Sequence, residues 1–376
     1  MRELEEIIKD AIRRDGPMSF DRFMEYALYE PGLGYYSSGR ATIGKAGDFY
    51  TNPSTGPVFG RLVAEVFSRL REQLPDTAAF IEIGAGEGHF ARDFLEHMKA
   101  YHDDEKVRYV IIERSDGMAE KQRATLGQLA RNVEWRLSLD GLPGPIDGIF
   151  FSNELLDAMP FHRVRVEDGR LKELFVALVG DYFTEVAGGL SDPNIPRYFN
   201  RLLIGLQDGM ETEVNLRMLG WMRDVAGKLG NGFVITVDYG LTACEYFSPA
   251  RSHGTLRCYH KHTQNDNPYS RIGDQDITAH VDFSSVAMVG KNEGVLPIFF
   301  SDQTSFLMTA IPGLEAAMMK GGASREEFEK AAQGMKALLH PDWMGSAFSV
   351  LVQSKGISDT EGLFGSSRNR VESLFL

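Results

Sequence analysis

The sequence predicts an α/β protein built on a Rossmann-like, mostly parallel sheet. The first observation is the apolar run Phe80-Ile-Glu-Ile83, which leads directly into Gly-Ala-Gly-Glu-Gly88. A strand, a glycine turn and a helix in this order bring bare backbone against a ligand at the carboxyl edge of such a sheet. The second is the alternation of strand-like and helix-like segments that follows, which indicates parallel strands with right-handed crossovers. The third is size, because 376 residues, 43% of them hydrophobic, can form one large domain with insertions or two domains sharing a cleft.

The sequence of residues 1–75 predicts helices and a long loop, and we expect this segment to cover the active site. Apolar residues recur at helical spacing in 4–12 and 20–28, and Ser19 is placed to cap the second helix. Residues 29–53 are too rich in glycine, proline and tyrosine for regular structure. Long irregular loops in compact proteins are usually functional, so we expect this loop to lie over the site.

We expect the core of the fold to consist of residues 76–160 and 211–376. Apolar periodicity predicts strands at 80–83, 107–112, 133–136, 147–151, 232–238, 297–300 and 348–352. It predicts helices at 58–70, near 90–100 and 116–130, and at 213–229 and 313–338. The pattern of residues 161–210 differs from that of the core and predicts a β-hairpin around Glu167-Asp-Gly169. We expect this segment to be an inserted α+β region that lies over the sheet edge and contacts the substrate.

The glycine spacing favours S-adenosylmethionine over NAD as the cofactor. A dinucleotide turn needs Gly-x-Gly-x-x-Gly, and here Gly88 comes one residue too soon after Gly84 and Gly86. Glu82 and Glu87 would also repel a pyrophosphate, by ~1 kcal/mol at 4 Å in bulk water. A tight turn without a ligand is the alternative reading.

Further cofactor contacts are expected at the ends of the next strands. Glu113 closes the strand at 107–112, where a carboxylate can hydrogen-bond both hydroxyls of a ribose. The predicted cofactor-binding set is Glu82, Gly84, Ala85, Gly86, Gly88, Glu113, Arg114, Ser115 and Asn153.

Composition excludes several classes of function. A net charge of −13 disfavours nucleic-acid binding. The chain also contains no run of 18 apolar residues, which a membrane-spanning helix would need. Cys244 and Cys258 have neither metal-ligand spacing nor a disulfide framework, and His260 and His262 flank Lys261 in a pattern unsuited to a metal, so no metal is assigned. The acidic first ten residues resemble no transit or signal peptide, which predicts a cytoplasmic protein.

Several motifs together resemble one family of methyltransferases. They include Tyr29-Glu-Pro-Gly-Leu-Gly-Tyr-Tyr36, Gly47-Asp-Phe-Tyr-Thr51, Asn153-Glu-Leu-Leu-Asp-Ala-Met-Pro160, Asp238-Tyr-Gly240 and Asp276-Ile-Thr-Ala-His-Val-Asp282. The chain resembles the S-adenosylmethionine-dependent family that contains mitochondrial complex I assembly factor 7 and the bacterial MidA proteins. The resemblance implies a class I methyltransferase sheet of seven strands and symmetric dimethylation of an arginine in a complex I subunit. Ala85, Asn52 and Ser346 depart from the family pattern, which leaves the role of the C-terminal motif open.

An arginine acceptor requires carboxylates, because no ordinary base deprotonates a guanidinium with a pKa above about 12. Glu154 and Asp157 follow the strand at 147–151, and they would share one helical face if the segment is helical. We expect them to grip the guanidinium in bidentate fashion, with Glu154 as the leading catalytic residue. The alternative is that Asn153 caps a helix whose first turn the acids merely favour.

Other residues are assigned less directly. Asp48, Phe49 and Thr51, with Tyr35 and Tyr36, are expected to contact the substrate, or else to pack. His280 is the candidate acceptor of the proton released after methylation, or else a structural histidine. A protein substrate and a homodimer are the expected partners.

Three other functions stay open at this point. They are a small-molecule methyltransferase whose pocket the insertion closes, an S-adenosylmethionine-binding assembly chaperone without turnover, and, more distantly, an NAD oxidoreductase.

Overall fold

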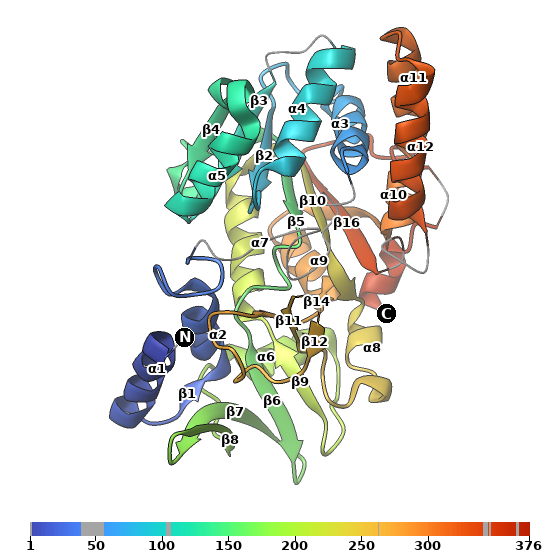
Figure 1. Ribbon diagram of the computed structural model, residues 1–376. Coiled ribbons are helices and arrows are strands. Elements are labelled where there is room, and N and C mark those ends of the chain that lie inside the picture. Colours follow the sequence, from blue (N-terminus) through green and yellow to red (C-terminus); the bar gives the residue numbers. More distant parts are fainter. Residues whose placement is uncertain are drawn as a thin grey trace.

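The computed structural model describes residues 2–38, 56–102, 107–261, 263–340, 345, 347–365 and 368–376. A large sheet with helices on both faces forms one part of the molecule, and two smaller sheets with the amino-terminal helices lie below its strand ends in Figure 1. No helix in these described ranges has the length and apolar character needed to cross a bilayer.

The large sheet has the strand order β15-β16-β10-β5-β2-β3-β4, and β14 pairs with the end of β10. Its strands are β2 (Ala79–Ile83), β3 (Arg108–Ile112), β4 (Val133–Arg136), β5 (Ile146–Asn153), β10 (Leu229–Leu241), β14 (Val281–Asp282), β15 (Leu296–Asp302) and β16 (Phe348–Lys355). The neighbours from β4 to β10 run parallel, whereas β16 is antiparallel to both β10 and β15. The sheet is therefore mixed and eight-stranded, and the expectation of seven strands did not include the short β14.

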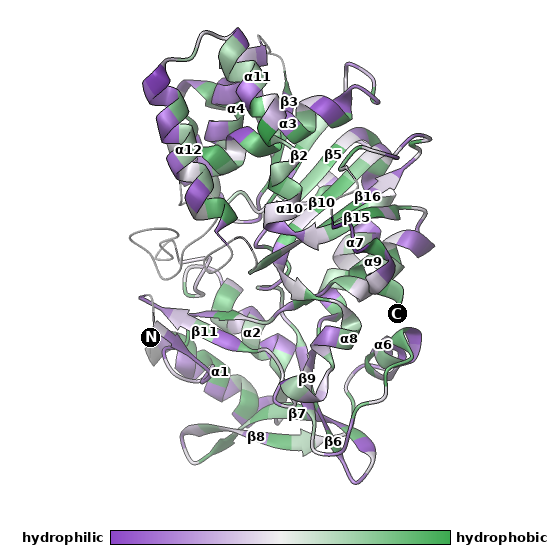
Figure 2. Ribbon diagram, turned by 90° about the vertical axis from the view of Figure 1, so that its right-hand side faces the viewer, coloured by the Kyte–Doolittle hydropathy of each residue, from purple (hydrophilic) through white to green (hydrophobic). Residues whose placement is uncertain are grey.

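Both faces of the large sheet are covered, which explains why all five residues of β2 are buried and why the central strands are mainly apolar (Figure 2). Successive side chains of a strand point to opposite faces. Phe80 accordingly packs in the core under α3 and α4, and its neighbour Ile81 packs in the core under α7 and α9. The covering helices are α3 (Val58–Arg71), α4 (His89–His102), α5 (Asp116–Leu126), α7 (Leu216–Lys228), α9 (Phe283–Asn292), α10 (Gln303–Met308), α11 (Ile311–Lys320) and α12 (Arg325–Leu339). Short 3-10 turns are η2 (Gly127–Asn132), η3 (Leu139–Gly141) and η6 (Val371–Phe375).

Three predicted helices have different boundaries in the structure. The helix expected over 313–338 is two helices, because Gly322 adopts φ +71° and a capping box at Ser324 starts α12 afresh. The helix expected over 116–130 stops at Leu126, where Gly127 has φ +53°. The helix expected from residue 213 begins only after Asn215, whose side chain accepts from the Met218 amide.

A second sheet has the order β1-β7-β6-β9, with β8 on the other edge of β7. Its strands are β1 (Met18–Ser19), β6 (His162–Glu167), β7 (Arg170–Val179), β8 (Tyr182–Gly188) and β9 (Glu211–Val214). The predicted hairpin is confirmed, since β6 and β7 pair around Asp168 and Gly169, both with positive φ. The sheet extends beyond the expected insertion of 161–210, because β1 and β9 also join it.

The amino-terminal helices α1 (Arg2–Asp15) and α2 (Phe20–Tyr29) pack against this second sheet. Ser19 occupies the N-cap of α2 as predicted, but its hydroxyl bonds to Asp21 and caps no helix amide. A third sheet has the order β12-β11-β13, and it consists of β11 (Arg257–His260), β12 (Thr263–Asn265) and β13 (Asp276–Thr278). The remaining elements are α6 (Asn194–Leu202), α8 (Ala243–Tyr246) and η4 (Pro249–Arg251).

Candidate functional site

The glycine turn between β2 and α4 leaves little room for a side chain at Gly84 or Gly88. Gly84, Gly86 and Gly88 adopt φ +75°, +51° and +84°, a region that favours glycine. A Cβ on Gly84 would lie 2.9 Å from Leu155 Cδ1, and one on Gly88 would lie 3.1 Å from Gln122 Cα. The turn therefore presents bare backbone at the carboxyl end of β2, which is the geometry of a nucleotide-like cofactor cradle.

Gln122 of α5 connects this turn to the next strand, and sequence analysis missed it. Its fully buried amide donates from Nε2 to the Gly86 carbonyl and to Glu113 Oε2, at 2.9 Å each. Its Oε1 accepts from Trp135 Nε1 at 3.0 Å. A glutamine within a helix has no sequence signal that marks such a role, because its partners come from three other segments.

Glu113 lies directly after β3, as the sequence predicts. Its Oε1 accepts the Ser115 amide at 2.9 Å, so two donors hold the carboxylate, and burial raises its pKa. Its neighbours have structural partners of their own. Arg114 lies 4.4 Å over the Tyr29 ring, and Ser115 caps α5 by accepting from the Met118 amide.

Glu82 lies in the core beside the turn and is only 4% exposed. Tyr109 of β3 donates to Glu82 Oε2 at 2.7 Å, and burial raises the pKa of this carboxyl to about 8. The structure thus places Glu82 as a buried support of β2 and β3. Ala85, also in the predicted cofactor set, is buried in the same core.

The segment after β5 is not helical, which corrects the expected arrangement of Glu154 and Asp157. Asn153 ends β5 and donates to Glu154 Oε1 at 2.9 Å, so it caps no helix. Glu154 adopts φ +51°, and its amide donates to the Val237 carbonyl at 3.0 Å. Asp238 holds the turn that follows, since its Oδ2 accepts the Leu155 and Leu156 amides at 3.1 and 2.8 Å.

Four carboxylates nevertheless converge at this end of β5 and β10. Burial, followed by the charges of Asp238, Asp276 and Glu154, raises the pKa of Asp157 well above its ordinary value. Burial also raises the pKa of Asp238 to about 7, against the effect of the backbone amides that it accepts. Asp276 was not among the predicted site residues, although it belongs to a motif that the sequence singled out. Burial and mutual repulsion therefore favour the protonated forms of these acids, and a bound cation would favour their ionised forms.

Tyrosines surround these acids. The Tyr36 hydroxyl donates to Asp276 Oδ1 at 2.9 Å, and the Tyr36 ring stacks on Tyr29 at 5.5 Å. Tyr239 lies on the other side, where burial and then the charges of Glu154 and Asp157 raise its pKa. Tyr36 is thus beside the acids, as expected of a substrate contact. The other predicted substrate residues, Asp48, Phe49 and Thr51, lie outside the described residues, as do Asn52 and Ser346.

His280 follows Asp276 closely in the sequence, but it lines a cavity to which none of the four carboxylates contributes. The amide of its neighbour Ala279 donates to the Asp157 carbonyl at 3.0 Å. Its ring lines a cavity with Arg251 and Arg257, and burial together with these two cations lowers its pKa to about 4. Among the described residues, no hydrogen bond joins the ring to Glu154 or Asp157.

The described part of the chain holds one cluster of side chains able to ligate a metal, far along α4 from the glycine turn. Glu65 Oε1 lies 2.5 Å from His97 Nε2 and 2.8 Å from His102 Nε2, and the three ligand atoms lie within 4.8 Å of one another. Hydrogen bonding from the imidazoles to the carboxylate accounts for this geometry. His260, considered in the sequence, instead bonds through Nδ1 to the Asp274 carbonyl at 2.6 Å.

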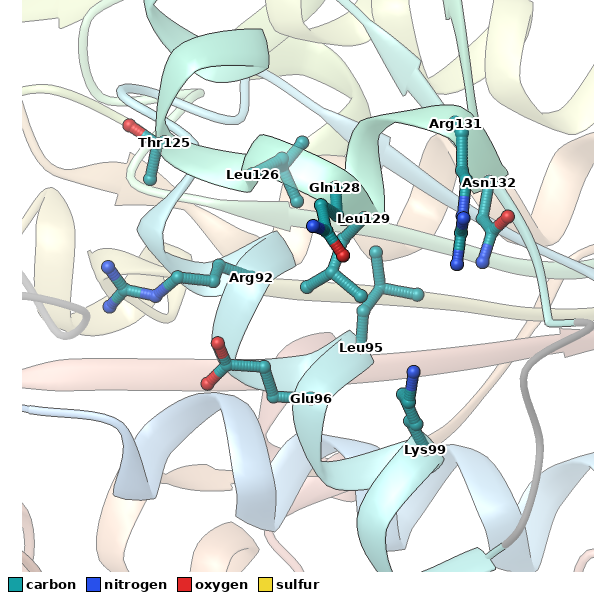
Figure 3. Close-up of a pocket in the computed structure, with 10 residues that line it drawn as sticks. All are labelled: Arg92, Leu95, Glu96, Lys99, Thr125, Leu126, Gln128, Leu129, Arg131 and Asn132. Carbon is teal, nitrogen blue, oxygen red and sulfur yellow. The ribbon is translucent and has the colours of Figure 1, made fainter.

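A further cavity of about 260 Å³ lies between α4 and the end of α5 (Figure 3). Arg92, Glu96 and Lys99 project from α4, and Arg131 and Asn132 face them from the opposite wall. None of the predicted site residues lines it, so it plays no part in the site described above.

Known proteins are similar to this chain in sequence and fold, and the crystal structure of one of them contains S-adenosyl-homocysteine. A model of the Methyltransf_28 family of S-adenosyl-L-methionine-dependent methyltransferases matches residues 58–299. The crystal structure of a COG1565 superfamily member from Burkholderia thailandensis bound to S-adenosyl-homocysteine is similar, with a TM-score of 0.87 and 28% identity over 98% of this chain and 95% of that one. A native crystal structure from the same superfamily and organism gives a TM-score of 0.85 at 28% identity, over 99% of this chain and 96% of that one.

Curated relatives are similar along most of their length. A protein named "Protein arginine methyltransferase NDUFAF7 homolog, mitochondrial" from Drosophila melanogaster is 26% identical over 93% of this chain and 84% of its own. The Caenorhabditis elegans protein of that name is 27% identical over 78% and 73%, and the human NDUFAF7 protein is 23% identical over 90% and 80%.

These relatives correct the predicted location. They are named mitochondrial, which conflicts with a cytoplasmic protein, so that prediction is wrong. The prediction used the first ten residues, and nearly all of them lie in α1 (Arg2–Asp15), a helix of the fold. The residues that the prediction used therefore do not distinguish the two compartments.

Proposed function

The chain belongs to the Methyltransf_28 family of S-adenosyl-L-methionine-dependent methyltransferases, and from this premise we propose that it methylates an arginine side chain of a protein. The carboxylate cluster of Glu154, Asp157 and Asp276 at the end of β5 is the observation that carries the proposal. The names of the curated relatives support the same acceptor. The complex I type subunit that the family resemblance implies stays a prediction.

The residues around the glycine turn fit the cofactor. Gly84 and Gly88 leave the backbone bare where a Cβ would meet Leu155 or Gln122, and Glu113 offers a carboxylate for the ribose hydroxyls. When bound, S-adenosylmethionine supplies a methyl group already activated by its sulfonium. The protein then has mainly to align the acceptor nitrogen and to shape the charge around it.

The carboxylates can compensate for the low nucleophilicity of a guanidinium. Its lone pairs are delocalised, and it stays protonated at any physiological pH. We expect Glu154 to bind one edge of the guanidinium in bidentate fashion, which fixes its plane and draws positive charge away from the attacking nitrogen. Tyr36 and Tyr239 add aromatic rings beside these acids, and aromatic rings attract cations.

The same cluster offers a base for the proton that leaves. Once the new nitrogen–carbon bond has formed and the sulfur–carbon bond has broken, the methylated nitrogen must lose one proton. Asp157 is the proposed acceptor, because a bound guanidinium cation would favour its ionised form and its raised pKa then favours uptake of the proton. His280 is not needed for this step, because its ring lines another cavity.

Methyl transfer by the Glu154→Gln variant tests the proposal. Purified protein is incubated with tritiated S-adenosylmethionine and mitochondrial and bacterial lysate, and labelled bands are hydrolysed for methylated amino acids. We expect label in methylarginine for the wild type and a loss of about 100-fold or more in the variant, because glutamine keeps the shape of the side chain and removes its charge. Calorimetry should give the same affinity for S-adenosylmethionine in both. Glu329→Gln, which changes an exposed glutamate of α12, is the matched control.

The other functions are outcomes of the same assay. Label in a small molecule would indicate a metabolite methyltransferase, and cofactor binding without any transfer would indicate a chaperone. Label in methyllysine, or equal turnover by Glu154→Gln, would contradict the arginine mechanism.

A further inference from the structure

A second cavity, of about 590 Å³, lies between β9 and the third sheet. The segment from Ala250 to Arg257 forms one wall, and the start of β6 and His280 contribute the others. Its charged lining residues are Arg163, Arg251, Arg257, Glu211 and Asp266. Cations therefore outnumber carboxylates, although the chain as a whole is acidic.

Two of these cations lack a counter-ion within the described ranges. Arg251 donates only to the Glu245 carbonyl, at 2.7 Å, and weakly to the Ser248 hydroxyl, at 3.4 Å. Arg257 donates to its neighbouring carbonyl, at 2.6 Å. No ion pair joins either guanidinium to Asp266 among the described residues.

The two glutamates nearest the wall already have partners. Glu211 pairs with Arg163 at 3.2 Å and with Arg165 at 2.5 Å. Glu213 is only 4% exposed, and both of its oxygens accept from the Thr255 amide, with further donors from Leu256 and Tyr246. Neither glutamate is available to neutralise Arg251 or Arg257.

Gly254 brings the backbone of this wall against Glu213. It adopts φ +74°, and a Cβ there would lie 2.2 Å from Glu213 Oε1. The carboxylate of Glu213 thus fixes the loop that carries both arginines. The cavity is accordingly a built site whose wall is held by buried hydrogen bonds.

His280 provides an independent sign that something polar is expected here. Its Nδ1 is buried and has no hydrogen-bond partner among the described residues. A buried polar atom without a partner costs about 1–3 kcal/mol, so such atoms usually meet a ligand or a water. Arg251, Arg257 and His280 all line this cavity, and the charges of the two arginines act on the imidazole ring.

The cavity adjoins the acidic cluster through the third sheet. Arg257 pairs with Thr278, and Tyr259 pairs with Asp276, in antiparallel register. Residues two apart on a strand share a face, so Arg257 and Asp276 project from the same face of this sheet. They lie two residue pairs apart, as diagonal neighbours about 7–8 Å from each other, and His280 lies within about 13 Å of Asp276 along extended chain.

We propose that Arg251, Arg257 and His280 bind a carboxylate of the methyl acceptor, so that the enzyme selects an arginine with an acidic residue two to four positions away. This inference rests on the proposed function, because the acidic cluster must hold the arginine. It adds a specificity element that the acidic cluster alone would not provide. An extended peptide spans about 3.3 Å per residue, which matches the separation of the two sites.

A pair of peptides tests the proposal by calorimetry in the presence of S-adenosylhomocysteine. One is acetyl-Glu-Ala-Ala-Arg-Ala-Ala-Glu-amide, and the other has glutamine in place of both glutamates. We expect the glutamate peptide to bind about tenfold or more tightly, since hydrogen bonds between charged groups are the strong ones. Arg257→Gln and Arg251→Gln should each bring the two affinities within about threefold of each other. Arg325→Gln, at an exposed arginine of α12, should keep the full difference.

The outcomes separate this inference from the proposed function. Equal affinity of wild-type protein for the two peptides would overturn the carboxylate site, and so would a preference that survives in both arginine variants. Binding of inorganic phosphate without a preference between the peptides would show a site for free anions, which also overturns it. Cofactor binding and tritium transfer to lysate proteins are measured on the same samples. Failure of the proposed function would appear there as a loss of transfer to arginine, whereas failure of this inference alone would leave that transfer intact and abolish the preference between the peptides.

Discussion

At the scale of single residues, the carboxylate of Glu113 is held by two donors, the Ser115 amide and the Gln122 side chain. A carboxylate fixed in this way needs little reorganisation when it receives the hydroxyls of a ribose. Gln122 also holds the Gly86 carbonyl, so one amide sets the position of the glycine turn relative to β3. We therefore assign Gln122 as a positioning residue for the cofactor.

Glu113→Ala and Gln122→Leu test this assignment. We expect Glu113→Ala to weaken S-adenosylmethionine binding by ~1–3 kcal/mol, or about 5- to 150-fold, through the lost hydrogen bonds. Gln122→Leu should weaken it less, because Ser115 still holds the carboxylate. Calorimetry on both variants and on the double variant gives the coupling between the two residues. Strictly additive effects would show that Gln122 does not act through Glu113.

Single residues also show where sequence reasoning succeeds. The spacing of Gly84, Gly86 and Gly88 predicted a turn with bare backbone, and all three adopt the positive φ that such a turn requires. The positive φ of Glu154 could not be predicted, because a non-glycine residue adopts it only when tertiary contacts hold it there. Gln122 escaped detection for a related reason, since its partners are distant in the sequence.

At the scale of elements, the turn after β5 depends on β10. Asp238 accepts the amides of Leu155, Leu156 and Tyr239 through its two oxygens, and the Glu154 amide donates to Val237. The turn that presents Glu154 is therefore held from the neighbouring strand, without help from a helix of its own. This dependence explains why a helical reading of Asn153–Asp157 failed, since local spacing contains no information about β10.

Asp238→Ala should separate catalysis from cofactor binding. The change leaves buried amides without an acceptor, which costs roughly 1–3 kcal/mol for each, and it frees Glu154 from its position. We expect a lower free energy of unfolding in urea and a fall in kcat, with the affinity for S-adenosylmethionine kept within about threefold. Asp302→Ala is the matched control, because Asp302 accepts the Ser305 amide at the start of α10, outside the site. A comparable loss of stability with unchanged kcat in both variants would contradict the role given to Asp238.

Elements with a strong local signal were predicted well, and those that other elements shape were not. The strands 80–83 and 107–112 and the hairpin at Asp168-Gly169 lie where their patterns placed them. The long helix expected over 313–338 failed because its apolar period continues across Gly321 and Gly322, which interrupt the backbone. β14 has only two residues and carries no detectable period of its own.

At the scale of the whole molecule, buried acids give the fold a characteristic response to pH. Burial raises the pKa of Glu82 to about 8 and that of Asp238 to about 7, and it raises the pKa of Glu113, Asp157 and Asp282. An unfolded chain releases the same protons near pH 4. Between these values the native state binds more protons than the unfolded state, so the free energy of unfolding must fall as pH rises. The buried histidines His97 and His280, whose pKa burial lowers, act in the opposite direction below about pH 6.5.

Glu82→Gln isolates one of these acids, and the comparison is cleanest between pH 6.5 and 8, above the titration of His97 and His280. His162, whose pKa is raised by its partner Glu173 despite burial, titrates alike in both proteins. Glutamine matches the protonated glutamic acid in shape and still accepts from the Tyr109 hydroxyl. We expect wild-type protein to lose stability across this interval, by at most ~1.4 kcal/mol per pH unit for each group that titrates. The variant should follow a flatter curve, equal to wild type in the free energy of unfolding near pH 4 and increasingly more stable than wild type up to pH 8. Urea unfolding at four pH values measures both curves, with Glu329→Gln as the exposed control. Parallel curves for Glu82→Gln and wild type would mean that Glu82 is already ionised in the folded protein, and that the stability of the sheet beneath the cofactor turn does not depend on its proton.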